Sequence, residues 1–142
     1  MSKSTSTPKK ETGGQATAKA DERLQIFKRL KLILSRYSPP LTAVSDYESR
    51  YELVSKKQVT YRGKQVDQVY FGAVIIQGAY VGLYLSAVYD EPANLERIGE
   101  DLRKKLKGKS CFHIKKLDDS LALQVEQAVK TGFEYYEREG VI

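Results

Sequence analysis

The apolar positions between residues 22 and 37 recur every three or four residues, which predicts an amphipathic helix. The stripe is formed by Leu24, Phe27, Leu30 and Leu34, and is widened by Ile26, Ile33 and Tyr37. Asp21 is suited to cap the first turn, because its carboxylate can accept from free backbone N–H groups. Pro39 and Pro40 end the helix, since a proline ring clashes with the preceding helical turn.

The pattern changes to alternation between residues 41 and 89, where β-branched and aromatic residues are frequent. This composition predicts a meander of strands. The segment Arg62-Gly63-Lys64 predicts a turn within it. The most strand-like stretch runs from residue 69 to 89 and is divided by Gln77-Gly78, which predicts a β-hairpin.

Two further helices and one strand are predicted after the hairpin. Asp90-Glu91-Pro92 is typical of a helix start, and Gly108 of its end. Residues 110–114 form a short strand, and a last helix runs from Asp118 or Asp119 to Gly140. One face of that helix is apolar, formed by Leu121, Val125, Ala128, Val129, Phe133 and Tyr136. The predicted fold is therefore α+β, an antiparallel sheet of four or five strands with three helices packed on it.

Charge and composition divide the 142 residues into a tail and one domain. Residues 1–20 hold four lysines and one glutamate, so this segment carries a net charge of +3, half of the +6 of the whole chain. This tail lacks the apolar residues needed to offset the entropy of ordering it, so we expect disorder over 1–20 and a single domain over 21–142. No apolar run is long enough for a membrane span or a secretory signal, which favours a cytoplasmic protein. The basic residues of the domain alternate with acidic ones, so nucleic-acid binding is expected to be weak and unspecific.

Familiar catalytic and metal-binding motifs are missing from the sequence. There is one histidine, His113, and one cysteine, Cys111. A metal cluster or a triad that needs two histidines is therefore excluded, and we predict neither a metal nor a cofactor. Cys111 and His113 lie two residues apart on a predicted strand, so their side chains share a face about 7 Å apart. A thiolate activated by the imidazole is one interpretation; a small buried cysteine beside a histidine is the other.

The predicted hairpin brings small and aromatic residues onto one face. With Gln77-Gly78 as the turn, Ile75 pairs with Tyr80, Ala73 with Gly82 and Phe71 with Tyr84. Ala73 and Gly82 then form a floor between aromatic walls, which suits a flat or aliphatic ligand. The alternative is that a helix packs against the small residues. The candidate ligand-binding residues are Phe71, Tyr80, Gly82, Tyr84, Ser86, Cys111 and His113.

Four segments resemble a known family. They are Tyr61-Arg62-Gly63-Lys64, residues 69–71, residues 80–84 and residues 108–118 (GKSCFHIKKLD), in that order and spacing. Together they resemble the YdhG-like family of small bacterial proteins, a domain family of unknown function, over residues 22–142. The resemblance implies a compact, free-standing α+β domain with no assigned catalytic residues. A distant branch is described as frataxin-like iron chaperones; the first predicted helix carries basic residues instead of the acidic ridge such iron binding uses.

These observations favour a non-enzymatic domain that binds a small molecule or a protein. The alternative is a frataxin-like protein that handles iron, and a third possibility is an enzyme that uses Cys111.

Overall fold

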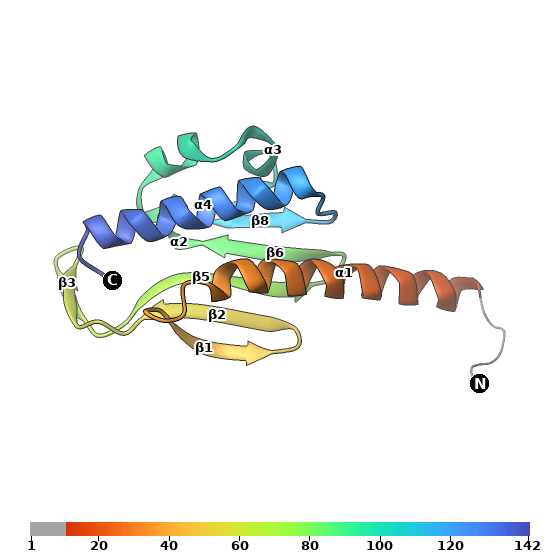
Figure 1. Ribbon diagram of the computed structural model, residues 1–142, viewed down its shortest axis with the longest axis horizontal. Helices are drawn as coiled ribbons and strands as arrows, with labels where there is room; N and C mark the ends of the chain where they lie inside the picture. Colours follow the sequence, from red (N-terminus) through yellow and green to blue (C-terminus); the bar gives the residue numbers. More distant parts are fainter. Residues whose placement is uncertain (1–10) are drawn as a thin grey trace.

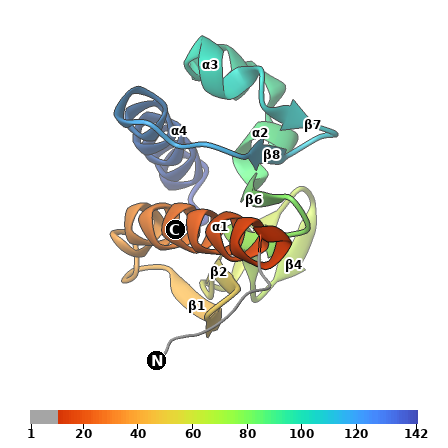
Figure 2. The same ribbon diagram turned by 90° about the vertical axis from the view of Figure 1, so that its right-hand side faces the viewer.

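The computed structural model describes the backbone of residues 11–142 and the side chains from residue 22 onward. It is an α+β fold in which two long helices lie on one face of a six-stranded antiparallel sheet (Figures 1 and 2). The predicted class and the antiparallel sheet are thus confirmed, although the sheet has more strands than expected. Among the described helices, none combines the length and the apolar character that a bilayer span requires.

The first helix, α1 (Glu11–Ser35), begins earlier than the predicted start at Asp21. Asp21 therefore lies inside the helix and is not its cap. The helix ends at Ser35, shortly before Pro39 and Pro40, as these prolines predict. Phe27, Leu30 and Leu34 of the predicted apolar stripe are buried. Residues 1–10 of the predicted tail lie outside the described residues.

The main sheet has the strand order β1-β2-β5-β6-β8-β7, and a separate hairpin pairs β3 with β4. The strands of the main sheet are β1 (Thr42–Tyr47), β2 (Arg50–Ser55), β5 (Val69–Gln77), β6 (Tyr80–Leu85), β7 (Leu106–Lys107) and β8 (Cys111–Ile114). The separate hairpin joins β3 (Val59–Tyr61) to β4 (Lys64–Val66). Its turn is formed by Arg62 and Gly63, within the segment where the sequence predicts a turn, and both residues have positive φ.

The segment after β6 differs from the prediction of one strand followed by one long helix. The strand ends at Leu85, and the chain continues as α2 (Ser86–Asp90), the 3₁₀ helix η1 (Pro92–Arg97) and α3 (Glu100–Arg103). The long helix is interrupted at Gly99, where the Gln124 side chain accepts a hydrogen bond from the backbone N–H of Leu102 at 2.9 Å. A Cβ at Gly99 would lie 2.4 Å from Gln124, so this tertiary contact overrides the local helical pattern.

The last helix, α4 (Asp119–Arg138), agrees closely with its prediction. The Asp118 side chain caps it by accepting from the N–H of Leu121 at 2.8 Å. Val125, Val129 and Tyr136 are buried against the rest of the core. Ion pairs join α4 to α1 and to the turn that follows α1, from Arg29 to Asp119 at 2.6 Å and from Arg36 to Glu126 at 3.2 Å.

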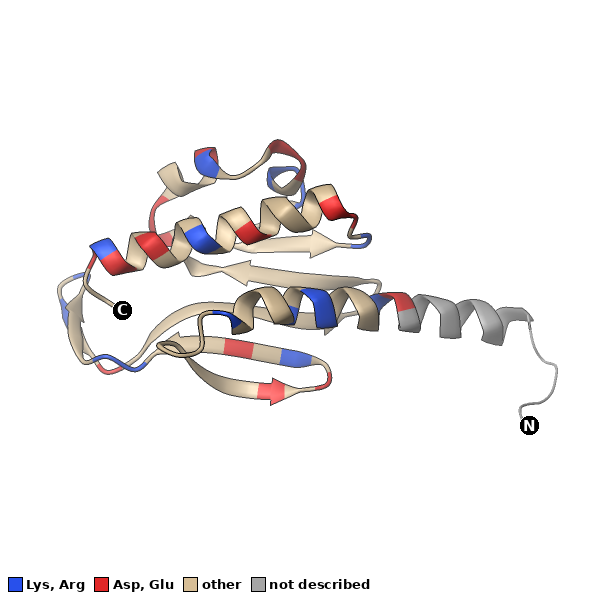
Figure 3. Cartoon of the chain, in the orientation of Figure 1, with Lys and Arg blue, Asp and Glu red and all other residues tan. Residues whose placement is uncertain are grey.

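The core lies between the two long helices and one face of the sheet. An aromatic cluster occupies its centre, where the Phe71 ring lies 6.1–6.4 Å from the rings of Tyr37, Phe133 and Tyr136. Charged positions are distributed along the helices, on β1 and β2 and in the loops (Figure 3). Because both long helices lie on this side of the sheet, the described elements leave its opposite face without a helix over it (Figure 2).

Candidate functional site

The face of the sheet opposite the two helices, here called the open face, is formed by alternate residues of β2, β5, β6 and β8. The cross-strand register pairs Ala73 with Tyr84 and Tyr84 with Cys111. The next row pairs Ile75 with Gly82 and Gly82 with His113. Because side chains alternate between faces, their strand neighbours Val74, Leu83 and Phe112 point to the helices and are fully buried. Ile75, Tyr84, Cys111 and His113 are only half-buried.

Five of the seven predicted site residues come together on the open face. Tyr80, Gly82 and Tyr84 lie along β6, and Cys111 and His113 lie beside them on β8. The turn of the hairpin is Gly78-Ala79, so Gln77 pairs with Tyr80, and each pairing is displaced by two residues from the predicted register. A displacement of two preserves the faces, which is why these residues still share a side.

Phe71 does not belong to the site, contrary to the prediction. The register between β2 and β5 shifts at Leu53/Val54, where Leu53 pairs with Gly72 but Val54 pairs with Tyr70. This bulge turns Phe71 into the aromatic core, where it is 3% exposed. Tyr70, one residue earlier, takes its place at this end of the open face.

Ser86 also lies apart from the paired residues of β5, β6 and β8 in the middle of the open face, which are here called the central row. It is the first residue of α2, beyond the end of β6, and lines a cavity with Tyr70 and Ser110. This cavity lies at the end of the open face, because Ser110 directly precedes Cys111 and its carbonyl accepts from the N–H of Leu85.

Gly82 is buried beneath side chains of the same face of the sheet. A Cβ built at Gly82 would lie 2.5 Å from the Gln77 side-chain oxygen and 3.0 Å from the Tyr84 ring. The nearest atoms are thus the ends of flexible side chains and none belongs to a helix. The alternative that a helix packs on Gly82 is therefore wrong for the described residues.

Two contacts order the side chains around Gly82. The Tyr80 ring stacks on the His113 imidazole with 3.7 Å between centroids and 13° between planes. The Tyr84 hydroxyl donates to the Gln77 side-chain oxygen at 3.1 Å. The stack presents a flat platform and the hydrogen bond fixes one wall, so the surface is largely formed before a ligand arrives.

Cys111 does not have the properties of an activated nucleophile. Burial raises the pKa of its thiol, and the neighbouring Tyr84 hydroxyl offsets only part of that rise. A higher pKa leaves less thiolate at neutral pH, and the thiolate is the reactive form. His113 is engaged by Tyr80. This geometry favours the interpretation that Cys111 is a small residue of the sheet surface.

A hydrogen-bonded group around Glu52 borders the open face, and sequence reasoning missed it. The Glu52 carboxylate accepts from the hydroxyls of Ser45 at 2.7 Å and Tyr70 at 2.8 Å, and pairs with Arg50 at 3.1 Å. Burial favours protonation of Glu52, but these three partners together outweigh burial and lower its pKa. The group depends on pairing between β1, β2 and β5, which local spacing does not reveal.

A second polar group, around Asp90, joins segments far apart in the chain. Its carboxylate accepts hydrogen bonds from the hydroxyls of Tyr61 and Tyr136. Burial raises the pKa of both phenols, and the bond to Asp90 raises it further, so both remain donors. The sequence pattern predicts Asp90 at the start of a helix, whereas its hydrogen bonds hold the β3–β4 hairpin against the end of α4.

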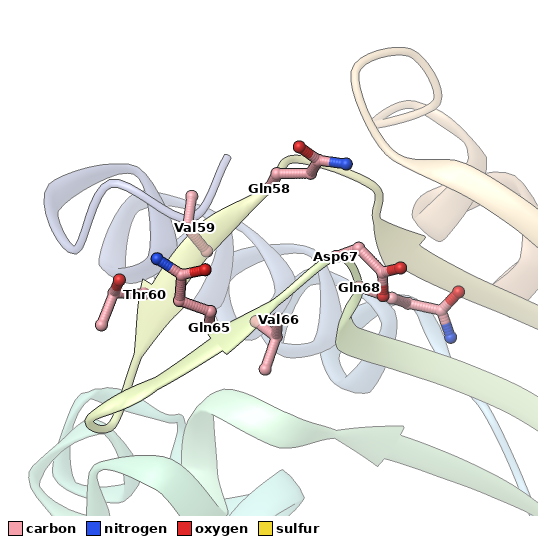
Figure 4. Close-up of a pocket in the computed structure, with 7 residues that line it drawn as sticks. All are labelled: Gln58, Val59, Thr60, Gln65, Val66, Asp67 and Gln68. Carbon is pink, nitrogen blue, oxygen red and sulfur yellow. The ribbon is translucent and has the colours of Figure 1, made fainter.

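Two larger hollows lie away from the open face. One of about 780 Å³ is formed by the β3–β4 hairpin and the residues flanking it (Figure 4). Its lining is mostly polar and comes from one continuous segment, residues 58–68, so no second element closes it. The other, of about 590 Å³, lies between α1 and the segment before α4, with Ile26, Leu32 and Leu117 in its lining.

Within residues that the structure describes, no three His, Cys, Asp or Glu side chains are grouped as a metal ion would require. The chain was compared with protein-family descriptions, with curated proteins and with solved structures. None of the three comparisons finds a match.

Proposed function

We propose that this chain is a non-enzymatic binding domain whose ligand lies on the open face. The observation that carries the proposal is the placement of α1 and α4 on a single face of the sheet. The other face is left with Tyr80, Tyr84 and His113 half-buried around Gly82. Half-buried aromatic rings on a sheet face that carries no helix are typical of surfaces that bind flat or apolar groups.

The arrangement supports binding better than catalysis. Burial raises the pKa of Cys111, the one nucleophilic side chain in the central row, and the imidazole of His113 is stacked on a ring. An activated nucleophile instead needs a lowered pKa or an adjacent base that contacts it. Among the described contacts, none favours the iron-handling alternative over binding at the open face.

The proposal is tested with an aromatic dye, 8-anilinonaphthalene-1-sulfonate, whose fluorescence rises when it leaves water for an apolar surface. The wild-type protein is expected to bind the dye saturably. Gly82→Val should weaken this binding several-fold, because the isopropyl group displaces the Gln77 and Tyr84 side chains from their positions on the open face.

Thr60→Val is the matched control, because it places the same valine side chain at an exposed strand position on the β3–β4 hairpin. It should bind the dye as the wild-type protein does. Equal binding by all three proteins would place the dye elsewhere and contradict the proposal.

A further inference from the structure

The cavity at the end of the open face has a lining that differs from the central row. It encloses about 270 Å³ and is lined by Tyr61, Tyr70, Tyr89 and Asp90, together with Ser86 and Ser110. These residues come from β3, β5, α2 and the turn before β8, so the cavity exists only in the folded chain. Its volume equals that of about nine water molecules at ~30 Å³ each, which suffices for a compact organic group.

The charge of the lining favours a cation over an anion. Among the described residues that line the cavity, Asp90 is the one charged group and neither lysine nor arginine is present. The Asp90 side chain is 12% exposed, and its Oδ2 accepts from two tyrosine hydroxyls. Its Oδ1 has a cation, the Arg62 guanidinium, at 3.7 Å. A bound anion would be repelled by this poorly solvated carboxylate.

The tyrosine rings add a second attraction for cations. The face of an aromatic ring carries partial negative charge and attracts ammonium groups within about 6 Å of its centroid. The chain already shows this preference, because the Lys109 ammonium lies 5.4 Å from the centroid of the Tyr89 ring. Lys109 is exposed, and the Arg62 side chain is 56% exposed. An incoming cation therefore competes with both side chains in reach of water, and with the hydrogen bond that the Arg62 guanidinium donates to the Asp90 backbone oxygen at 2.9 Å.

We propose that this cavity binds an organic ammonium group, such as a quaternary or methylated amine. Asp90 supplies the compensating charge, and the rings of Tyr61, Tyr70 and Tyr89 contact the methyl groups. Methylation favours this site because it removes N–H groups that would otherwise need hydrogen-bond acceptors. The inference does not depend on a ligand at Gly82, since Gly82 is not part of the cavity lining.

The first test compares choline with its uncharged carbon isostere, 3,3-dimethylbutan-1-ol, by NMR titration of the ¹⁵N-labelled protein. Choline is expected to shift the amides around Tyr61, Tyr89 and Ser110 saturably, and the isostere should bind at least about fivefold more weakly. Equal binding of the two compounds would show an apolar pocket without selection for charge and would overturn the proposal. No shift with choline, or stronger binding of inorganic phosphate at the same amides, would also overturn it.

The second test uses variants of the cavity. Tyr89→Leu removes a half-exposed ring and Asp90→Asn removes the charge while keeping an oxygen that accepts from the tyrosines; each should weaken choline binding at least about fivefold. Tyr47→Leu is the matched control, because Tyr47 is 56% exposed on β1 and lies outside the cavity. Because the Tyr89 side chain is 49% exposed, Tyr89→Leu remains informative even if Asp90→Asn fails to fold. Choline binding by Tyr89→Leu that equals that of Tyr47→Leu would overturn the proposal.

Discussion

Two tyrosine hydroxyls of this protein donate to side-chain oxygens in very different surroundings. Tyr84 donates to Gln77 on the open face, where both residues are half-buried. Tyr136 donates to Asp90 from within the core and is 1% exposed. Water can replace the first hydroxyl as a partner of Gln77, but it cannot readily reach the second.

Removing each hydroxyl tests this difference. We expect Tyr84→Phe to lower the free energy of unfolding by less than about 0.5 kcal/mol, and Tyr136→Phe by about 1.5–3 kcal/mol, because its bond is to a carboxylate. Urea unfolding of both variants measures the two losses. A large loss for Tyr84→Phe would show that the open face is covered and behaves as core.

The Cys111 thiol is expected to be slow to react. Burial raises its pKa, so the rate of alkylation by iodoacetamide should rise with pH through a midpoint above that of an ordinary cysteine. Tyr84→Phe should move this midpoint higher still, since the Tyr84 hydroxyl lowers the thiol pKa. Rapid alkylation of the native protein at neutral pH would instead support the interpretation of Cys111 as a catalytic nucleophile.

Glu52 is expected to make stability depend on pH. Its pKa in the folded protein is lowered, so its contribution is fully present above the unfolded-state pKa. That contribution is lost as the pH falls through the lower, folded-state pKa. The wild-type protein should therefore be more stable than Glu52→Gln at pH 7, and the difference should shrink steadily below pH 4 in urea unfolding curves. A difference that is constant between pH 7 and pH 3 would contradict this assignment.

At the scale of the strand, two glycines of the central hairpin have different neighbours. A Cβ at Gly72 on β5 would lie 2.6 Å from the backbone oxygen of Tyr84, which can move only if the strands separate. A Cβ at Gly82 on β6 would meet only side-chain ends. Gly72→Ala should therefore cost about 1–3 kcal/mol, whereas Gly82→Ala should be close to neutral. Urea unfolding of the pair measures this, and equal losses would contradict the described packing of the hairpin.

The elements that the sequence predicted well are those set by local pattern. The stripe of α4 and its Asp118 cap involve residues within a few turns of one another, and both are found as expected. The faces of Tyr80, Gly82 and Tyr84 were also predictable, because alternation survives a register displacement of two. Features that depend on distant partners were missed, namely the bulge that buries Phe71, the interruption at Gly99 by Gln124, and the cavity around Asp90.

At the scale of the whole molecule, the arrangement of the layers defines the candidate site. The sequence predicted three helices packed on the sheet, with a helix against the small residues around Gly82 as one of its two interpretations. In the structure the two long helices share one face and are joined by the Arg29–Asp119 ion pair, while Arg36, directly after α1, pairs with Glu126 on α4. The apolar pattern of the hairpin strands did not reveal which face the helices cover, because half-buried open-face residues such as Ile75 are as apolar as core residues.

The central claim, that the open face is the binding surface, is tested most directly by locating bound ligands. The measurement is a ¹³C NMR titration of the aromatic side chains with a set of small aromatic fragments. The account predicts that the largest shifts occur at the rings of Tyr80, Tyr84 and His113 and that Gly82→Val weakens the binding they report several-fold. Unchanged binding in Gly82→Val, or shifts that occur only at core rings such as Phe133, would contradict it.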